Sequence, residues 1–339
     1  MKKLLAPLFL LACNAAPEPK APENPANTTG TMQTETPANA GKQVEGPVAP
    51  ASSDDVKKGI AALKAGDTNG AKAAFEVATQ KNPKQADAWH YLGLVNDQTG
   101  NRPEAEKDYR KALELQPDLV ESATNLSAIL VETGRNDEAI ALMKKAIAKD
   151  GRNAALQVNL GMALSMKGDV DGASKAFDEA IRLDPNSGIN YVTYADHLAR
   201  ASKQAEAVAK LKQGEKIAAQ DAGTLASVAL AYKSMKDFKS CVAVLDKAVA
   251  LRDLAELRIY RGTCKLGLKD LPGATTEFKD AIVKEPTNAV AHYSLGNALA
   301  DQKDFTGAVT EWETYLKLAP DGPQAKSAQK RIQIAKSKK

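Results

Sequence analysis

Apolar residues recur at helical spacing through most of this chain, in short stretches separated by turn residues. Between Trp89 and Pro117 they mark one face of a first helix and then one face of a second, with Gly100 between the two. Neither helix can bury its apolar face alone. The pattern therefore predicts a helical hairpin that is stable only when neighbouring segments cover it.

Small residues recur every 33 or 34 residues over the same region, in three columns that keep the same phase. The first column is Ala71, Ala105, Ala139, Ala173, Ala207, Cys241, Ala274 and Ala308. The second is Ala78, Ala112, Ala146, Ala180, Gly214, Ala248, Ala281 and Tyr315, in which only the last member is large. The third is Gly59, Gly93, Ser127, Gly161, Ala195, Ala229, Gly262 and Gly296. Small side chains let two helix backbones approach closely, so the columns predict internal repeats that pack hairpin on hairpin.

One unit carries a specific set of large and small residues: Trp89, Leu92, Gly93, Ala105, Tyr109 and Pro117. The second-helix aromatic recurs as Phe75, Tyr109, Phe177, Phe278 and Trp312, and the closing proline as Pro83, Pro117, Pro185, Pro286 and Pro320. This set resembles the tetratricopeptide repeat. The resemblance implies an all-α fold, a right-handed superhelical α-solenoid of helix-turn-helix units.

Residues 52–322 divide into eight such units: 52–85, 86–119, 120–153, 154–187, 188–221, 222–254, 255–288 and 289–322. Residues 323–339 carry Ala325, Ala328, Ile332 and Ala335 along one helical face, which predicts a C-terminal capping helix. Its terminal basic cluster is interpreted as a solvated face, with contact to anionic lipid or an acidic partner as the alternative.

The fifth and sixth units depart from the pattern. Ser202 and Lys236 occupy the column where the first four units have a turn glycine, and Ala219 and Asp253 replace the closing proline. Ordinary repeat drift explains these changes, because each repeat contacts only its neighbours. A shift in superhelical twist or a seam between two sub-arrays is the alternative.

The start of the chain has the features of an export signal. Residues 1–12 combine two lysines, a short apolar run and a small residue before Cys13, too short a run to span a bilayer. Leu10-Leu11-Ala12-Cys13 resembles the bacterial lipobox, which implies acylation at Cys13; an ordinary signal peptide with an incidental cysteine is the alternative. Asn14 in place of Asp favours the outer membrane, facing the periplasm, over the inner membrane.

Residues 13–51 are rich in Pro, Ala, Asn, Thr and Glu and contain no aromatic residue. Such a composition buries too little apolar surface to offset chain entropy, so it predicts a disordered tether between the lipid and the repeats.

Charge and chemistry narrow the function. The net charge of +4 comes from the two chain ends, and the repeats carry no basic stripe interleaved with aromatics, which argues against nucleic acid. His90, His197 and His292 lie in separate units without metal-ligand spacing, and no phosphate loop or nucleophile elbow is present. We therefore expect no enzyme, metal, cofactor or small-molecule substrate. Cys241 and Cys264 are interpreted as buried thiols, with a disulfide between adjacent units left open.

The resemblance implies that the first helix of each unit lines a concave groove that binds a protein segment. The implied groove residues are Asp87, His90, Leu94, Asp97, Glu121, Val131, Glu132, Val158, Met162, Met166, Val192, Asp196, Leu230, Ile259, Tyr293 and Asn297. This set is apolar with acidic flanks, which suits an extended or helical peptide with apolar anchors and basic residues. Met162 and Met166 fit either an adaptable contact or inter-repeat core.

These features predict a lipid-anchored periplasmic scaffold for protein–protein interaction. The plan is similar to that of repeat lipoproteins that help assemble outer-membrane pores, such as type IV pilus secretins, or motility and envelope machinery. The alternative is a regulatory subunit that activates an envelope enzyme such as a cell-wall synthase.

Overall fold

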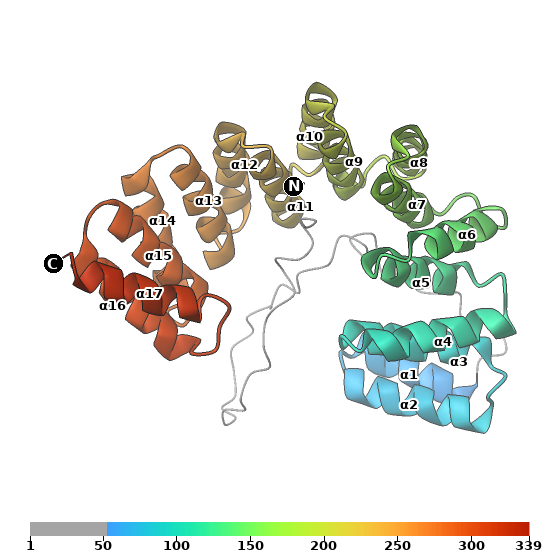
Figure 1. The fold of residues 1–339 in the computed structure, drawn as a ribbon. Coiled ribbons are helices and arrows are strands. Elements are labelled where there is room, and N and C mark those ends of the chain that lie inside the picture. Colours follow the sequence, from blue (N-terminus) through green and yellow to red (C-terminus); the bar gives the residue numbers. More distant parts are fainter. Residues whose placement is uncertain (1–52, 339) are drawn as a thin grey trace. The chain divides into compact units, whose positions relative to one another are not determined.

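A computed structural model describes residues 53–338, which form seventeen α-helices and no strand (Figure 1). The helices are α1 Asp54–Lys64, α2 Thr68–Lys81, α3 Ala86–Gln98, α4 Arg102–Leu115, α5 Val120–Glu132, α6 Asn136–Ile147, α7 Ala154–Lys167, α8 Val170–Leu183, α9 Gly188–Arg200, α10 Gln204–Ile217, α11 Ala222–Ser234, α12 Phe238–Leu251, α13 Ala255–Gly267, α14 Leu271–Lys284, α15 Ala289–Asp301, α16 Phe305–Leu318 and α17 Ala325–Lys336.

The chain divides after Glu132 into two compact units, which are described separately. In the first, α1 packs against α2 and α3 against α4 as helical hairpins. In the second, the hairpins α7/α8, α9/α10, α11/α12, α13/α14 and α15/α16 follow one another, and each packs on the next. The predicted all-α class of helix-turn-helix repeats is confirmed. The predicted signal peptide, Cys13 and the whole of the predicted tether lie outside the described residues.

The three columns of small residues are buried throughout. Every member of the first column has an exposed fraction of 0%. In the third column each glycine lies against the second-helix aromatic of its own repeat: a Cβ built on Gly161 would stand 2.9 Å from the ring of Phe177, and one on Gly93 would stand 2.9 Å from Tyr109. The two consensus positions therefore depend on each other, because the ring occupies the space that a larger side chain would need.

The turn inside each hairpin keeps one backbone conformation even where its glycine is lost. Gly66, Gly100, Gly134 and Gly168 all have positive φ angles, between 76° and 82°. The corresponding residues of the last four repeats have φ of 62° to 67°: Ser202, Lys236, Lys269 and Lys303. The later repeats therefore preserve the turn geometry, which is the behaviour expected of sequence drift on a fixed fold.

A fourth recurring pattern starts many of the second helices. Asp67 accepts a hydrogen bond from the amide of Gly70 at 2.8 Å, and Asp169 accepts one from Gly172 at 2.9 Å. The same contact recurs from Asp270 to Gly273 and from Asp304 to Gly307. Each aspartate caps a helix N-terminus, and a Cβ on the paired glycine would collide with its carboxylate. The D-x-x-G spacing is visible in the sequence and identifies the start of these helices.

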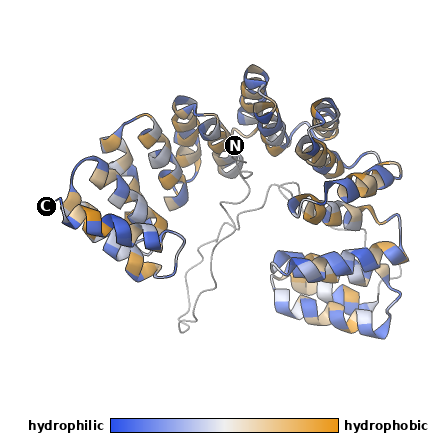
Figure 2. Ribbon diagram, viewed as in Figure 1, coloured by the Kyte–Doolittle hydropathy of each residue, from blue (hydrophilic) through white to orange (hydrophobic). Residues whose placement is uncertain are grey.

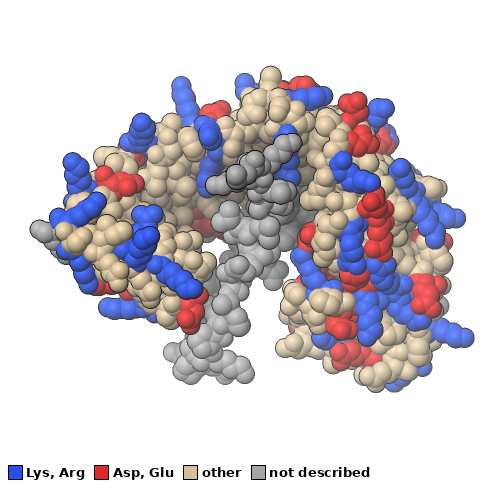
Figure 3. All heavy atoms as spheres, in the orientation of Figure 1, with Lys and Arg blue, Asp and Glu red and all other residues tan. Residues whose placement is uncertain are grey.

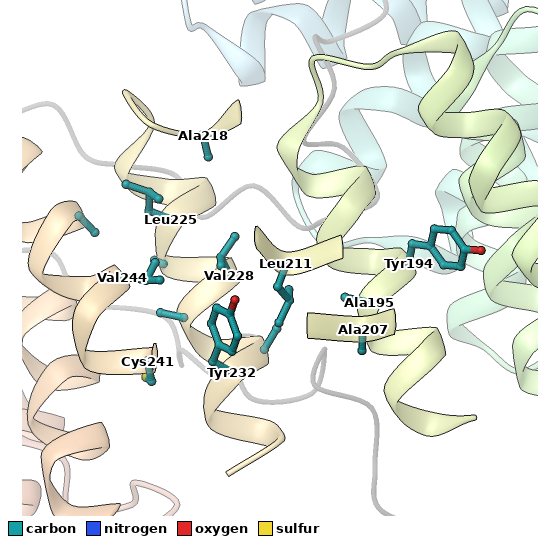
Figure 4. Packing of buried hydrophobic residues seen from close by; sticks show 14 of the residues in the cluster. Tyr194, Ala195, Ala207, Leu211, Ala218, Leu225, Val228, Tyr232, Cys241 and Val244 are labelled. Atoms are coloured by element: carbon teal, nitrogen blue, oxygen red, sulfur yellow. The ribbon is translucent and has the colours of Figure 1, made fainter. Parts of the chain in front are cut away.

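The irregular fifth and sixth repeats do not interrupt the core. One cluster of buried residues runs from Val158 to Cys264 and passes through both of them. Figure 4 shows part of it, where Leu211 of α10 meets Val228 and Tyr232 of α11. Apolar and polar residues are mixed along the helices (Figure 2), as expected when each buries one face and exposes another. The drift interpretation therefore accounts for these repeats, and the seam alternative finds no support there.

Helix α17 covers the last repeat in the way the sequence predicts. Ala325, Ala328, Ile332 and Ala335 are all buried, in one cluster with Trp312 of α16. Lys336 of α17 also pairs with Glu313 of α16 at 2.8 Å. The predicted capping helix is confirmed as a packed part of the array.

Candidate interaction surface

The first helices of successive repeats lie side by side within each unit. In the first unit α1 contacts α3 and α3 contacts α5; in the second, α7, α9, α11, α13 and α15 form a continuous row. We call the solvent-accessible side of these rows the first-helix face. The resemblance to the tetratricopeptide repeat implies that a partner segment binds to this surface.

Four of the predicted contact residues are not on that surface. His90 and Val131 each have an exposed fraction of 2%, and Val158 and Ile259 each have 7%. Their side chains belong to the packing between repeats, so we remove them from the proposed contact surface.

His90 shows how this packing works. Its Nδ1 atom lies 2.9 Å from the Ser122 hydroxyl of the next repeat, and its ring lies against Tyr91 and Tyr109. Burial lowers the pKa of His90 to about 4, so the ring is neutral at pH 7. The residue joins α3 to α5 and is not available to a partner.

The other twelve predicted residues remain at least partly accessible. Met166 and Glu132 are exposed, and ten are half-buried: Asp87, Leu94, Asp97, Glu121, Met162, Val192, Asp196, Leu230, Tyr293 and Asn297. The two methionines differ, because Met162 packs against the core cluster whereas Met166 is 39% exposed. Only Met166 suits an adaptable contact.

Much of the acidic character expected of the groove is neutralised within the chain. In the first unit Arg102 pairs with Asp97 at 3.5 Å and also with Glu132. In the second, Arg200 pairs with Asp196 at 2.8 Å. These carboxylates already have cationic partners, so the expectation of a partner rich in basic residues loses most of its basis.

Lys233 on α11 is the exception among the charged residues of α7, α9, α11 and α13. It is half-buried and has no hydrogen-bonding or ion-pair partner anywhere in residues 53–338. Burial lowers the pKa of this lysine. Leu230 lies one helical turn before it on the same first-helix face. A partner with an anionic group next to an apolar one could pair with Lys233 and cover Leu230 at the same time.

The two repeat cysteines form a disulfide between neighbouring repeats. Cys241 of α12 and Cys264 of α13 are both fully buried, as expected, but their sulfur atoms are bonded and their Cα atoms are 6.2 Å apart. This corrects the interpretation of two free thiols. The sequence alone left the pairing open because contact across a repeat junction depends on how the hairpins stack.

Two features of the described residues bear on other functions. Within residues 53–338, no group of three or more His, Cys, Asp or Glu residues is placed to hold a metal ion. No helix in that part of the chain is long and apolar enough to cross a membrane. Figure 3 shows acidic and basic side chains interspersed over the visible face.

Family models decide the classification. One model of the tetratricopeptide repeat matches residues 61–214, and a second matches residues 261–323. The chain belongs to the tetratricopeptide repeat family. Stacked helical hairpins of this family serve as scaffolds for protein contacts, so the fold of this tetratricopeptide protein implies protein or peptide binding.

Individual relatives share the repeats over part of their length. Protein FlbA of Caulobacter vibrioides is 30% identical over 141 residues, which cover 32% of this chain and 24% of FlbA. Human DnaJ homolog subfamily C member 7 is 24% identical over 248 residues, which cover 71% of this chain and 46% of the relative. The chain thus spans less than half the length of these relatives. Yeast Tom70 has a similar fold, with a TM-score of 0.66 at 20% identity, covering 89% of this chain and 69% of Tom70.

Proposed function

We propose that this tetratricopeptide protein is a lipid-anchored periplasmic scaffold that captures an apolar segment of another protein on its first-helix face. The row α7 to α15 supports the proposal most directly, because it presents accessible apolar side chains such as Val192 and Leu230 in a continuous series. A peptide laid across several first helices would bury these side chains together.

The disulfide supports a location outside the cytosol. Structural disulfides persist in oxidising compartments such as the bacterial periplasm and are rare in the cytosol. The pair Cys241–Cys264 is therefore consistent with the export signal and lipid attachment expected at Cys13. The tether would let the repeats reach a partner at some distance from the membrane.

The role we favour is assembly of an outer-membrane or envelope complex, such as a type IV pilus secretin or motility machinery. In a deletion strain we expect loss of secretin multimers or of the corresponding assembly. Unchanged multimers together with altered cell-wall crosslinking would instead indicate the regulatory subunit of an envelope enzyme.

Site-specific photo-crosslinking tests the surface. A photoreactive residue at Leu230 should give a defined adduct with the partner in cells, and one at Met166 should give the same adduct. Ala209 is an exposed residue on α10, a second helix, and serves as the matched control. Equal yields from Leu230 and Ala209, or no adduct from Leu230, would refute the first-helix face as the binding surface.

Fractionation tests the anchor separately. Wild-type protein should sediment with membranes, and Cys13→Ala should move it to the soluble fraction because alanine has no thiol to carry the lipid. Continued membrane association of Cys13→Ala would contradict lipid attachment at that residue.

A further inference from the structure

A cavity of about 590 Å³ lies between α10, the second helix of repeat five, and α12, the second helix of repeat six. We call it the lysine pocket; the residues that matter for its chemistry are Lys212, Glu215, Lys216, Ala219, Lys247 and Leu251. All come from second helices or the turn that follows them (Figure 1). The pocket is therefore independent of the first-helix face.

The lining of the lysine pocket carries a net positive charge, with three lysines and one glutamate. Its one acidic residue, Glu215, pairs with Lys247 across the two helices at 2.7 Å. Lys212 and Lys216 are exposed and have no partner within residues 53–338. They stand four residues apart on α10, a spacing at which like charges repel each other. A bound anion would remove that repulsion.

The rest of the lining of the lysine pocket is apolar and consists of Ala219, Ala250 and Leu251. Leu251, the last residue of α12, is 38% exposed, which makes it one of the few large apolar side chains left open to solvent on the described repeats. Ala219 lines the other side, at the position where regular repeats have their closing proline. The irregular fifth and sixth repeats thus place exposed apolar side chains beside two lysines that have no partner within residues 53–338.

We propose that the lysine pocket is a second docking site, which binds a protein segment that carries carboxylates next to an aliphatic or aromatic side chain. The carboxylates would accept hydrogen bonds from Lys212 and Lys216, and the apolar side chain would cover Leu251 and Ala219. One scaffold would then hold two different protein segments, one on the first-helix face and one in the lysine pocket.

A membrane surface fits this site less well than a protein segment does. Polybasic segments that bind anionic lipid use clusters of about four to eight lysines or arginines, whereas this pocket has two unpaired lysines and a third already paired with Glu215.

Peptide binding to the purified full chain tests the proposal. The probe is a fluorescein-labelled peptide of sequence GDELEFG, and its neutral counterpart GNQLQFG is the matched ligand control. Fluorescence anisotropy should show saturable binding of the acidic peptide that weakens with added salt. The neutral peptide should bind about tenfold more weakly or less, because it loses the charge-assisted hydrogen bonds.

Two double variants make the test specific. Lys212→Glu/Lys216→Glu should lower the affinity for GDELEFG by about tenfold or more. Lys175→Glu/Lys279→Glu makes the same change of charge at exposed sites on α8 and α14 and should bind like wild type. A pocket-filling variant, Ala250→Trp, should also lose binding without a change of charge. Unchanged melting curves establish that all three variants are folded.

Two outcomes overturn the proposal. The first is equal affinity of wild type and Lys212→Glu/Lys216→Glu for the acidic peptide. The second is absence of peptide binding while sedimentation with phosphatidylglycerol vesicles depends on the two lysines, which would make the site a lipid-headgroup site. Neither result affects crosslinking from Leu230, so this proposal and the proposed function fail or succeed separately.

Discussion

Cys241 and Cys264 are bonded to each other and tie the second helix of repeat six to the first helix of repeat seven. Their sequence separation is 23 residues, so the bond closes a loop that spans one repeat junction. Both cysteines also occupy fully buried positions at which the helices pack. The bond therefore fixes this one repeat junction covalently.

Removal of this bond should lower stability. For a loop of this length the chain-entropy model gives a contribution of about 3 kcal/mol. We expect Cys241→Ala/Cys264→Ala to lower the free energy of unfolding by about 2–4 kcal/mol in urea denaturation. Wild type unfolded in reductant is the control that separates the bond from the small volume lost in the alanine variant. Equal stability of oxidised wild type, reduced wild type and the variant would contradict a stabilising bond.

Glu277 provides the second prediction, because its buried carboxylate holds three cations together. It has an exposed fraction of 3%; it accepts hydrogen bonds from Lys265 at 2.7 Å and Arg261 at 2.8 Å, and lies 3.4 Å from Arg258. Glu277→Ala would leave Lys265 without a carboxylate partner among residues 53–338, whereas Arg258 would keep Asp253 and Asp280 and Arg261 would keep Asp246. We expect this broken buried pair to cost about 3 kcal/mol. Urea denaturation at pH 7 measures this cost, and Glu76→Ala, at an exposed position of α2, is the control.

The same carboxylate should make stability sensitive to acid. Burial acts to raise the pKa of Glu277, but the hydrogen bonds from Arg261 and Lys265 outweigh it and hold the pKa below its ordinary value of 4.5. A lowered pKa means that the contribution is present above about pH 4.5 and is lost as the pH falls below it. The stability difference between wild type and Glu277→Ala should therefore shrink between pH 5 and pH 3. A constant difference over that range would contradict the assignment.

Asp108 should have the opposite effect to Glu277 on how stability changes with pH. It is buried, it accepts a hydrogen bond from Asn96 at 2.8 Å, and burial raises its pKa to about 6 from 3.8. The native state therefore holds a proton that the unfolded state releases, so stability falls as the pH rises from about 4 through 6. Asp108→Asn removes the buried charge and should stabilise the protein by about 1 kcal/mol at pH 7. Thermal melts of both proteins at pH 4 and pH 7 check this: the gain should be larger at pH 7.

The turn lysines give a prediction about backbone strain. Lys236 has a φ of 62°, a conformation that costs a non-glycine residue about 1 kcal/mol. Lys236→Gly should relieve this strain and raise stability by about 0.5 kcal/mol, after allowance for the greater freedom of glycine in the unfolded chain. The reverse change, Gly100→Ala, should lower stability by about 1 kcal/mol. Equal melting temperatures for wild type and both variants would show that the turns tolerate either residue.

The pairing of Gly161 with Phe177 can be tested by adding one methyl group. A Cβ at position 161 would lie 2.9 Å from the ring, so Gly161→Ala should cost about 1–3 kcal/mol through overpacking. Gly151→Ala is the matched control, because its nearest neighbour would be the Ile147 carbonyl oxygen at an ordinary 3.6 Å. A melting temperature of Gly161→Ala equal to that of the control would contradict the dependence of the glycine column on the aromatic column.

The sequence by itself determined the number and register of the helical repeats. A position such as Ala139 is small in nearly every repeat because the same close helix crossing recurs every 33 or 34 residues. The face of α17 that contains Ile332 was predictable for the same reason, since helical spacing fixes which side chains share a side. The D-x-x-G capping pattern was equally present in the sequence, as a local contact that needs no tertiary information.

Only the tertiary structure decided how the side chains of neighbouring repeats share the surface. His90 and Val131 were predicted as contact residues from their positions in the family's repeat. These positions lie where the accessible face meets the next first helix, and the stacking of the helices buries both side chains. The pairing of Asp196 with Arg200 and of Cys241 with Cys264, and the isolation of Lys233, likewise depend on which atoms meet in space. The periodicity of the sequence specifies the order of the helices. The burial of border residues, the pairing of charged side chains and the lysine pocket arise from contacts between helices.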